Sequence, residues 1–328
     1  MAYMLNETGK LTILSRVTPL SVVIVADLPS WVIDFSAAGS QRFLDLHRGS
    51  VQTDIAFNAS GGRKRGFKIQ GHRLHVHSLT IAKITHIGDS ADDLADQNSF
   101  EQTAALALAC PGPATQDPTE PVDRIWKAMS SDLNDLHNDV NVTDNQMCRS
   151  FGAMLLVMAL SRVVFGLREG RSRSEVIDEL RHQNQLAELD ASGTVPSRRR
   201  VEESCQRIGL LEHDIGHIDI PARDALVRDA QPFNLLIKRT MASRRVFLTD
   251  GGHVGLGSVD CQPGDEVCVF ADGGRTPFLV RRRVGDKGDG DGEDRVLLGE
   301  AYVREFMHGG AVDELESQGC EWREICLV

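Results

Sequence analysis

Several residue patterns that mark common reaction classes are missing from this sequence. It has no GxSxG nucleophile elbow, no HExxH metal motif and no CxxC pair among its seven cysteines. The odd, scattered cysteines indicate reduced thiols in an intracellular protein, so we expect a cytoplasmic location. Hydrolysis, phosphoryl transfer and redox chemistry therefore lack their usual residues, and we expect no cofactor.

The sequence also lacks an excess of basic charge and a long apolar run. The net charge is −11, and the strongest basic run is only Arg198, Arg199 and Arg200. Nucleic acids and anionic membranes require a basic face, so we expect neither as a partner. No run approaches the roughly 18 apolar residues of a membrane span. The expected partner is a small apolar substrate, and the oligomeric state is left open.

Strand patterns occupy both ends of the chain and helix patterns occupy the middle. We expect an N-terminal β segment at 1–90, a helical region at 91–243 and a C-terminal β module at 244–328, which together make an α+β fold. Strands are expected at 11–14, 22–25, 54–58, 67–70, 74–77, 81–87, 246–249, 253–256, 266–271, 277–282 and 295–306. Helices are expected at 91–110, 121–129, 144–167, 174–189, 199–211 and 223–242. The short C-terminal strands with Gly-rich turns predict a small barrel or sandwich.

Four motifs suggest a ligand, but each has a simpler interpretation. His75 and His77 share one face of a predicted strand, and His213 and His217 are four apart, as metal ligands can be. The first pair also fits an exposed strand face, and the second lies in a Gly- and Pro-containing loop. The acidic run DKGDGDGED fails the calcium-loop pattern, and the glycines of GGHVGLG lack the dinucleotide-loop order. We therefore expect no metal site, and hairpin turns at these glycines.

Five segments occur in an order typical of one family. They are LPSWVIDFS at 28–36, FNASGG at 57–62 with LHVHSLTIAKITHIG at 74–88, RRVFLTDGGHVGLG at 244–257, PGDEVCVFADGGRTPFLVR at 263–281 and GEAYVREFMHGGA at 299–311. Together they resemble the region downstream of the HET domain in fungal heterokaryon-incompatibility (HET) proteins. The sequence departs from the family pattern at Ile33, Phe35, Ala82 and Gly310. The HET domain itself is not matched, and we expect it to be absent.

The resemblance implies two functions. HET-derived chains occur in fungal natural-product gene clusters, and some resemble pericyclases of the Diels–Alder type. This implies a cofactor-independent enzyme of secondary metabolism that cyclises an apolar substrate, such as a terpenoid, in a hydrophobic pocket. The alternative is a non-catalytic HET-derived interaction module of fungal incompatibility signalling. A closed apolar cavity would favour the enzyme, and an exposed apolar patch without a cavity would favour the module.

A cyclase would need an apolar pocket with a few hydrogen-bond donors. We expect Tyr302, Trp31 and His253 to be the catalytic donors. The expected substrate-binding residues are Phe35, Phe57, Phe151, Met154, Met158 and Phe306. A methionine stripe at helical spacing is also typical of an ordinary core.

Overall fold

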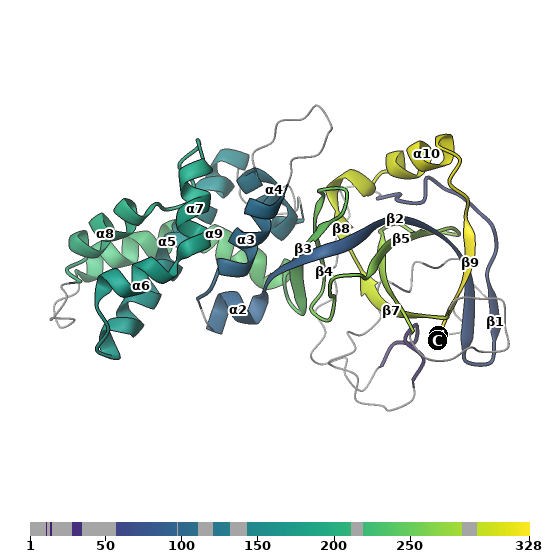
Figure 1. Ribbon diagram of the computed structural model, residues 1–328, viewed down its shortest axis with the longest axis horizontal. Coiled ribbons are helices and arrows are strands. Elements are labelled where there is room, and N and C mark those ends of the chain that lie inside the picture. Colours follow the sequence, from purple (N-terminus) through teal and green to yellow (C-terminus); the bar gives the residue numbers. More distant parts are fainter. Residues whose placement is uncertain are drawn as a thin grey trace. The chain divides into compact units, whose positions relative to one another are not determined.

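The computed structural model describes residues 11, 14, 28–34, 57–96, 98–110, 121–131, 143–210, 219–283 and 294–328 (Figure 1). The chain divides into two compact units. One unit combines Met1–Ile87 with Ala242–Val328, and the other is Gly88–Met241. The first is built of strands and the second of helices, which confirms the α+β fold class. The expected N-terminal and C-terminal β segments thus belong to one compact unit.

A closed barrel of five strands forms the body of the β unit. Its strands are β2 (Arg73–Ser90), β5 (Glu266–Phe270), β6 (Phe278–Arg282), β7 (Asp294–Glu300) and β9 (Arg323–Leu327). They follow the order β5-β6-β7-β9-β2, and β2 pairs back onto β5 to close the barrel. Closure removes the exposed edges that an open sheet of this size would present.

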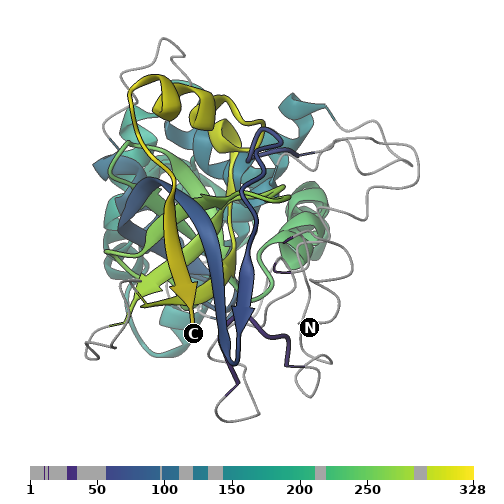
Figure 2. The same ribbon diagram turned by 90° about the vertical axis from the view of Figure 1, so that its right-hand side faces the viewer.

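The long strand β2 holds the barrel together. The sequence predicted two strands, 74–77 and 81–87, whereas the structure has one strand of 18 residues. Residues 74–78 pair with β9, and residues 78–83 pair with β5. A register shift between Thr80 and Ala82 marks a bulge, which bends a strand. In Figure 2, β9 runs directly beside β2, and β1 (Lys68–Gln70) pairs with β2 next to it.

A smaller antiparallel sheet extends the β unit. It contains β3 (Arg244–Thr249), β4 (Val254–Ser258) and β8 (Tyr302–Val303). Gly252 has φ of +76° in the β3–β4 turn, as expected for these glycines. Gly255 and Gly257 instead lie inside β4, where a Cβ at Gly255 would overlap the ring of Phe247 and a Cβ at Gly257 would overlap Leu279 Cδ1. Close packing, rather than a turn, therefore accounts for Gly255 and Gly257, which are half of the glycines that the sequence assigned to turns.

The C-terminal end of the chain differs most from expectation. The predicted strand 295–306 is divided into β7 and β8 and then gives way to the short 3₁₀ helix η5 (Arg304–Phe306). Helix α10 (Gly310–Ser317) and strand β9 were not predicted. Strand β9 begins with two charged, exposed residues, Arg323 and Glu324, so its strand pattern is short in the sequence.

Charged side chains are buried inside the β unit in pairs. The Arg244 Nη2 and Glu300 Oε1 atoms are 3.2 Å apart, and both side chains are almost fully buried. Burial lowers the pKa of Arg244 to about 10, against the attraction of Glu300. Glu266 accepts hydrogen bonds from Arg282 at 3.1 Å and from Arg295 at 3.3 Å. These buried charged groups of the β unit thus pair with groups of opposite charge.

The other unit consists of helices. They are α2 (Ala91–Asp96), α3 (Glu101–Ala109), α4 (Pro121–Ser130), α5 (Asp144–Arg168), α6 (Arg173–Glu179), α7 (Arg181–Leu189), α8 (Arg198–Arg207) and α9 (Ile220–Thr240). Two predicted helices are each divided in two, with breaks near Asn98 (φ of 46°) and at Leu180. Ser172 caps α6 by accepting from the Glu175 N–H, so that the helix starts before the predicted Ser174.

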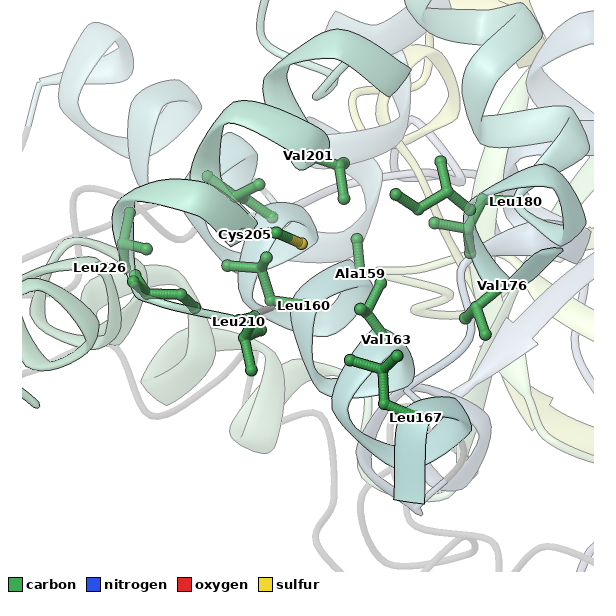
Figure 3. Close-up of a cluster of buried hydrophobic side chains, with 13 residues drawn as sticks. Ala159, Leu160, Val163, Leu167, Val176, Leu180, Val201, Cys205, Leu210 and Leu226 are labelled. Atoms are coloured by element: carbon green, nitrogen blue, oxygen red, sulfur yellow. The ribbon is translucent and has the colours of Figure 1, made fainter. Parts of the chain in front are cut away.

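Helix α5 is the central helix of this unit. Its side chains Ala159, Leu160, Val163 and Leu167 face a cluster contributed by α6, α8, α9 and Leu210 (Figure 3). By length and composition α5 could cross a membrane, but 72% of its apolar window is buried inside the protein. Packing therefore accounts for most of its apolar surface. The sequence predicted burial nearly all round, and Phe165 is the main exception at 63% exposed.

Some expected elements lie outside the described residues. These are the predicted strand 22–25 and most of the predicted strand 54–58. Leu11 and Leu14 are described, and both are buried in the core of the β unit together with Trp31.

Candidate functional site

Three of the predicted pocket residues lie in the core of the β unit. Trp31 is 2% exposed, and its Nε1–H donates to the carbonyl oxygen of His72 at 2.9 Å. Tyr302 is 1% exposed, and its ring meets Phe57 edge-on with centroids 6.2 Å apart. Trp31 and Tyr302 therefore act as packed core residues here, and the Trp31 donor is already engaged.

His253 and Phe306 form a second group in the β unit. The His253 ring meets the Phe306 ring edge-on, with centroids 4.7 Å apart. His253 Nδ1 lies 3.6 Å from Glu305 Oε2, slightly beyond hydrogen-bond distance. Burial works to raise the pKa of Glu305, but its interactions with His253 and its own backbone outweigh burial and hold that pKa below the ordinary value. Of the three predicted donors, His253 therefore has the most polar surroundings, because Glu305 lies beside it.

The remaining predicted residues belong to the helical unit or are not described. Phe151 is fully buried. Its ring centroid lies 5.7 Å from that of Phe100 and 5.0 Å from that of Phe233. Met154 and Met158 are also buried, which is the ordinary core arrangement that their spacing allows. Phe35 lies outside the described residues.

Only part of the motifs considered as metal sites lies within the described residues. Among the described residues, no group of three His, Cys, Asp or Glu side chains could hold a metal ion. His75 Nδ1 lies 3.3 Å from Glu324 Oε1, and His77 Nδ1 lies 3.1 Å from the Gly66 carbonyl oxygen. His213, His217 and most of the acidic run 286–294 lie outside the described residues.

The buried cysteines are not activated thiols. Burial raises the pKa of Cys205 to about 11, that of Cys268 to about 11 and that of Cys261 to about 12. Burial also raises the pKa of Cys148, whose Sγ lies 3.1 Å from Thr194 Oγ1. A nucleophilic cysteine needs the thiolate, so these thiols favour packing over catalysis.

A partly open cavity of about 710 Å³ lies within the helical unit. We call it the α5–α9 groove, because most of its apolar wall comes from α5 and α9: Val157, Leu160, Val164, Phe165, Leu226 and Val227. Its base coincides with the cluster in Figure 3, since Leu160, Val176 and Leu226 belong to both. Its rim holds exposed apolar groups, with Phe165 at 63% and Val227 at 47% exposure.

The charge of the groove opposes that of the chain. Four arginines and two glutamates line it: Arg162, Arg168, Arg171, Arg223, Glu169 and Glu179. Glu179 is paired with Arg171 and lies 3.9 Å from Arg162. Arg223 is paired with Asp224, which is not a lining residue, at 2.8 Å. Within the described part of the chain, Arg168 has no ion-pair partner, and its side chain is exposed.

Sequence reasoning did not identify this groove. None of the described residues predicted for a pocket lines it. Phe165 follows Val163 and Val164 near the end of a helix that is apolar on every side, so its outward direction leaves no signal in the pattern. The groove is suited to binding an apolar surface with acidic groups at its margin, since that surface would complement both its wall and its rim.

Comparison with known proteins identifies the C-terminal part of the chain. Residues 223–319 match the family model described as the Het-6 beta-barrel domain. A stretch of 80 residues is 40% identical to Heterokaryon incompatibility protein 6, OR allele, of Neurospora crassa. That match covers 24% of this chain and only 11% of the Neurospora protein. No solved structure matches the chain. These matches thus confirm the resemblance found in the sequence: the C-terminal part of the chain is similar to fungal heterokaryon-incompatibility (HET) proteins.

Proposed function

We propose that this chain is a non-catalytic, HET-derived interaction module of fungal incompatibility signalling, and that its helical unit binds an apolar segment of a partner protein in the α5–α9 groove. One observation carries the proposal. A partly open cavity has Phe165 and Val227 exposed at its rim. Exposed apolar groups rimmed by polar residues are typical of protein-binding surfaces.

The chemistry of the groove also favours binding over catalysis. Among the residues that the structure describes, its lining contains no histidine, cysteine or aspartate. Of these lining residues only Ser161 carries a hydroxyl, which donates to the Val157 carbonyl oxygen at 2.8 Å within the helix. The groove therefore presents shape, apolar surface and arginine charge, which are the means of recognition rather than of bond making.

The test compares the whole chain with two matched variants in fungal cells by proximity labelling. Phe165→Ser removes the rim aromatic, and Leu189→Ser alters a side chain that is 70% exposed on α7 and not part of the groove. Proteins labelled by the wild type should be lost from Phe165→Ser and kept by Leu189→Ser. An unchanged set of labelled proteins in Phe165→Ser would refute binding through the groove.

A second function, a cofactor-independent cyclisation of an apolar substrate, is supported by the size of the same groove. Its volume of about 710 Å³ lies within the range of about 300–1,000 Å³ that is usual for small-molecule sites. The purified chain would be incubated with a linear polyene precursor that cyclises slowly by itself. Unchanged rate and stereochemistry would reject this function. The catalytic roles of Tyr302, Trp31 and His253 stay a separate prediction, because none of the three lines this groove.

A further inference from the structure

We infer that the occupant of the α5–α9 groove is an amphipathic helix of a partner protein, with acidic residues flanking its apolar stripe. The inference rests on the proposed function and deepens it by naming the partner's chemistry. Three features of the groove support it: the spacing of its apolar wall, the excess of arginine, and an arginine without a partner.

The apolar wall has the form of a helix-binding groove. Val157, Leu160 and Val164 recur along α5 at three- and four-residue spacing, and Phe165 continues the row to the rim. Leu226 and Val227 of α9 also line the groove. An amphipathic helix inserts side chains at the same i, i+3, i+4 and i+7 spacing into such a wall.

The charge of the rim determines whether a bound helix should carry acidic or basic residues beside its apolar stripe. Four arginines against two glutamates give the groove a positive surplus in a chain whose net charge is −11. Glu179 is paired with Arg171, and Arg223 is paired with Asp224 outside the lining, which leaves Arg162 and Arg168 against Glu169. Acidic side chains on the partner would meet this surplus, and basic ones would be repelled.

Arg168 is the expected contact for an acidic residue. It is exposed in the last turn of α5, lines the groove and has no ion-pair partner among the described residues. Its guanidinium can bind a carboxylate through two parallel hydrogen bonds. Phe165, three residues earlier, lies on the same side of the helix, so the two could contact adjacent apolar and acidic residues of one partner helix.

The test uses synthetic helical peptides of about 15 residues and fluorescence anisotropy with the whole chain. Each peptide carries leucines at i, i+3, i+4 and i+7, flanked by glutamates in one peptide and by lysines in the other. At low salt the glutamate peptide should bind about tenfold more tightly. Near 1 M salt, where charges are screened within about 3 Å, the two affinities should converge.

Charge reversal at Arg168 tests whether this arginine causes the preference for the glutamate peptide. Arg168→Glu should weaken the glutamate peptide about fivefold and strengthen the lysine peptide. Arg228→Glu is the matched control, because Arg228 is exposed on α9 and does not line the groove. It should change both affinities only slightly, because a charge away from the groove is screened. Phe165→Ser should abolish binding of both peptides.

The outcomes separate this inference from the proposed function. Equal affinities for the two peptides, both lost in Phe165→Ser, would overturn the acidic preference and leave the groove as a protein-binding site. If neither peptide binds but labelling in cells still depends on Phe165, the helical occupant is wrong while the proposed function stands. Displacement of the bound peptide by dodecanoate at lower concentration than by free peptide would reassign the groove to small amphiphiles and overturn the inference.

Discussion

The two units of this protein treat large apolar side chains in opposite ways, and the ion pairs of the β unit include buried ones. Among the described residues, every large hydrophobic side chain that is markedly exposed belongs to the helical unit: Phe165, Leu189, Ile220, Val227 and Leu235. The β unit covers its apolar groups and pairs its charges internally, even where they are buried. Under the proposed function, the barrel is therefore the scaffold and the helical unit carries the binding surface.

The largest expected effect concerns the buried ion pair of the barrel. Glu300→Gln would leave the Arg244 guanidinium buried opposite a neutral amide. Breaking one side of a buried pair typically costs about 3–5 kcal/mol, and we expect that loss in urea unfolding.

Two controls define this prediction. Replacing both partners, as Arg244→Met with Glu300→Leu, should cost much less, because no charge is then left buried. Arg199→Ala breaks a pair whose arginine side chain is 86% exposed, and should cost at most about 1 kcal/mol. A loss for Glu300→Gln as small as that for Arg199→Ala would mean that the two units do not differ in this respect.

How much the sequence could predict also differs between the units. The short strands β3 to β6 were predictable, since turns with glycine or proline bound each of them. Strand β9 pairs with β2 and β7 in the barrel. Its few residues form a strand because of these pairings, which the local sequence pattern does not predict. In the helical unit the helices were predictable, whereas the breaks at Asn98 and Leu180 were not.

The candidate site could be predicted least. The sequence pointed to aromatic and methionine residues as pocket walls, but Phe151 and Met154 are fully packed. The groove instead uses Val164, Phe165 and Arg168, which all lie near the C-terminal end of α5. Which of these side chains face solvent depends on how α6 and α9 cover the helix, and no local pattern encodes that.

A medium effect is expected where α5 and α6 approach closely. A Cβ at Gly166 would overlap Cγ2 of Val176 on α6, so Gly166→Ala should separate the two helices beside the groove. Overpacking of this kind costs about 1–3 kcal/mol, measurable by urea unfolding. Gly310→Ala is the control, because a Cβ there meets nothing within 4 Å.

A double variant tests the cause of that effect. Val176→Ala removes the methyl groups that a Cβ at Gly166 would strike. In the double-mutant cycle, Val176→Ala should recover part of the loss caused by Gly166→Ala. Simple additivity of the two losses would show that contact with Val176 is not responsible.

A smaller, pH-dependent effect is expected at α10 in the β unit. Hydrogen bonds from Arg63 and Trp322 hold the pKa of Glu316 below its ordinary value of 4.5. A lowered carboxyl pKa contributes stability above the unfolded-state value, and that contribution is lost as the pH falls through the folded-state value. Urea unfolding from about pH 7 to about pH 3 should therefore show a shallower acid loss for Glu316→Gln than for the wild type. Glu321→Gln, at an exposed position on the same segment, should follow the wild-type curve.

The smallest effect on stability is expected at Phe165, where the effect on binding is expected to be greatest. Its side chain is 63% exposed, so Phe165→Ser removes little buried surface, and surface substitutions usually change stability by no more than about 0.5 kcal/mol. Urea unfolding should give nearly the wild-type value while peptide binding is lost. If stability falls by several kcal/mol instead, Phe165 is part of the helical core, and the contrast between a closed barrel and an open helical unit loses its main support. A side chain that can be removed without loss of stability, but not without loss of binding, is what separates a recognition surface from a core.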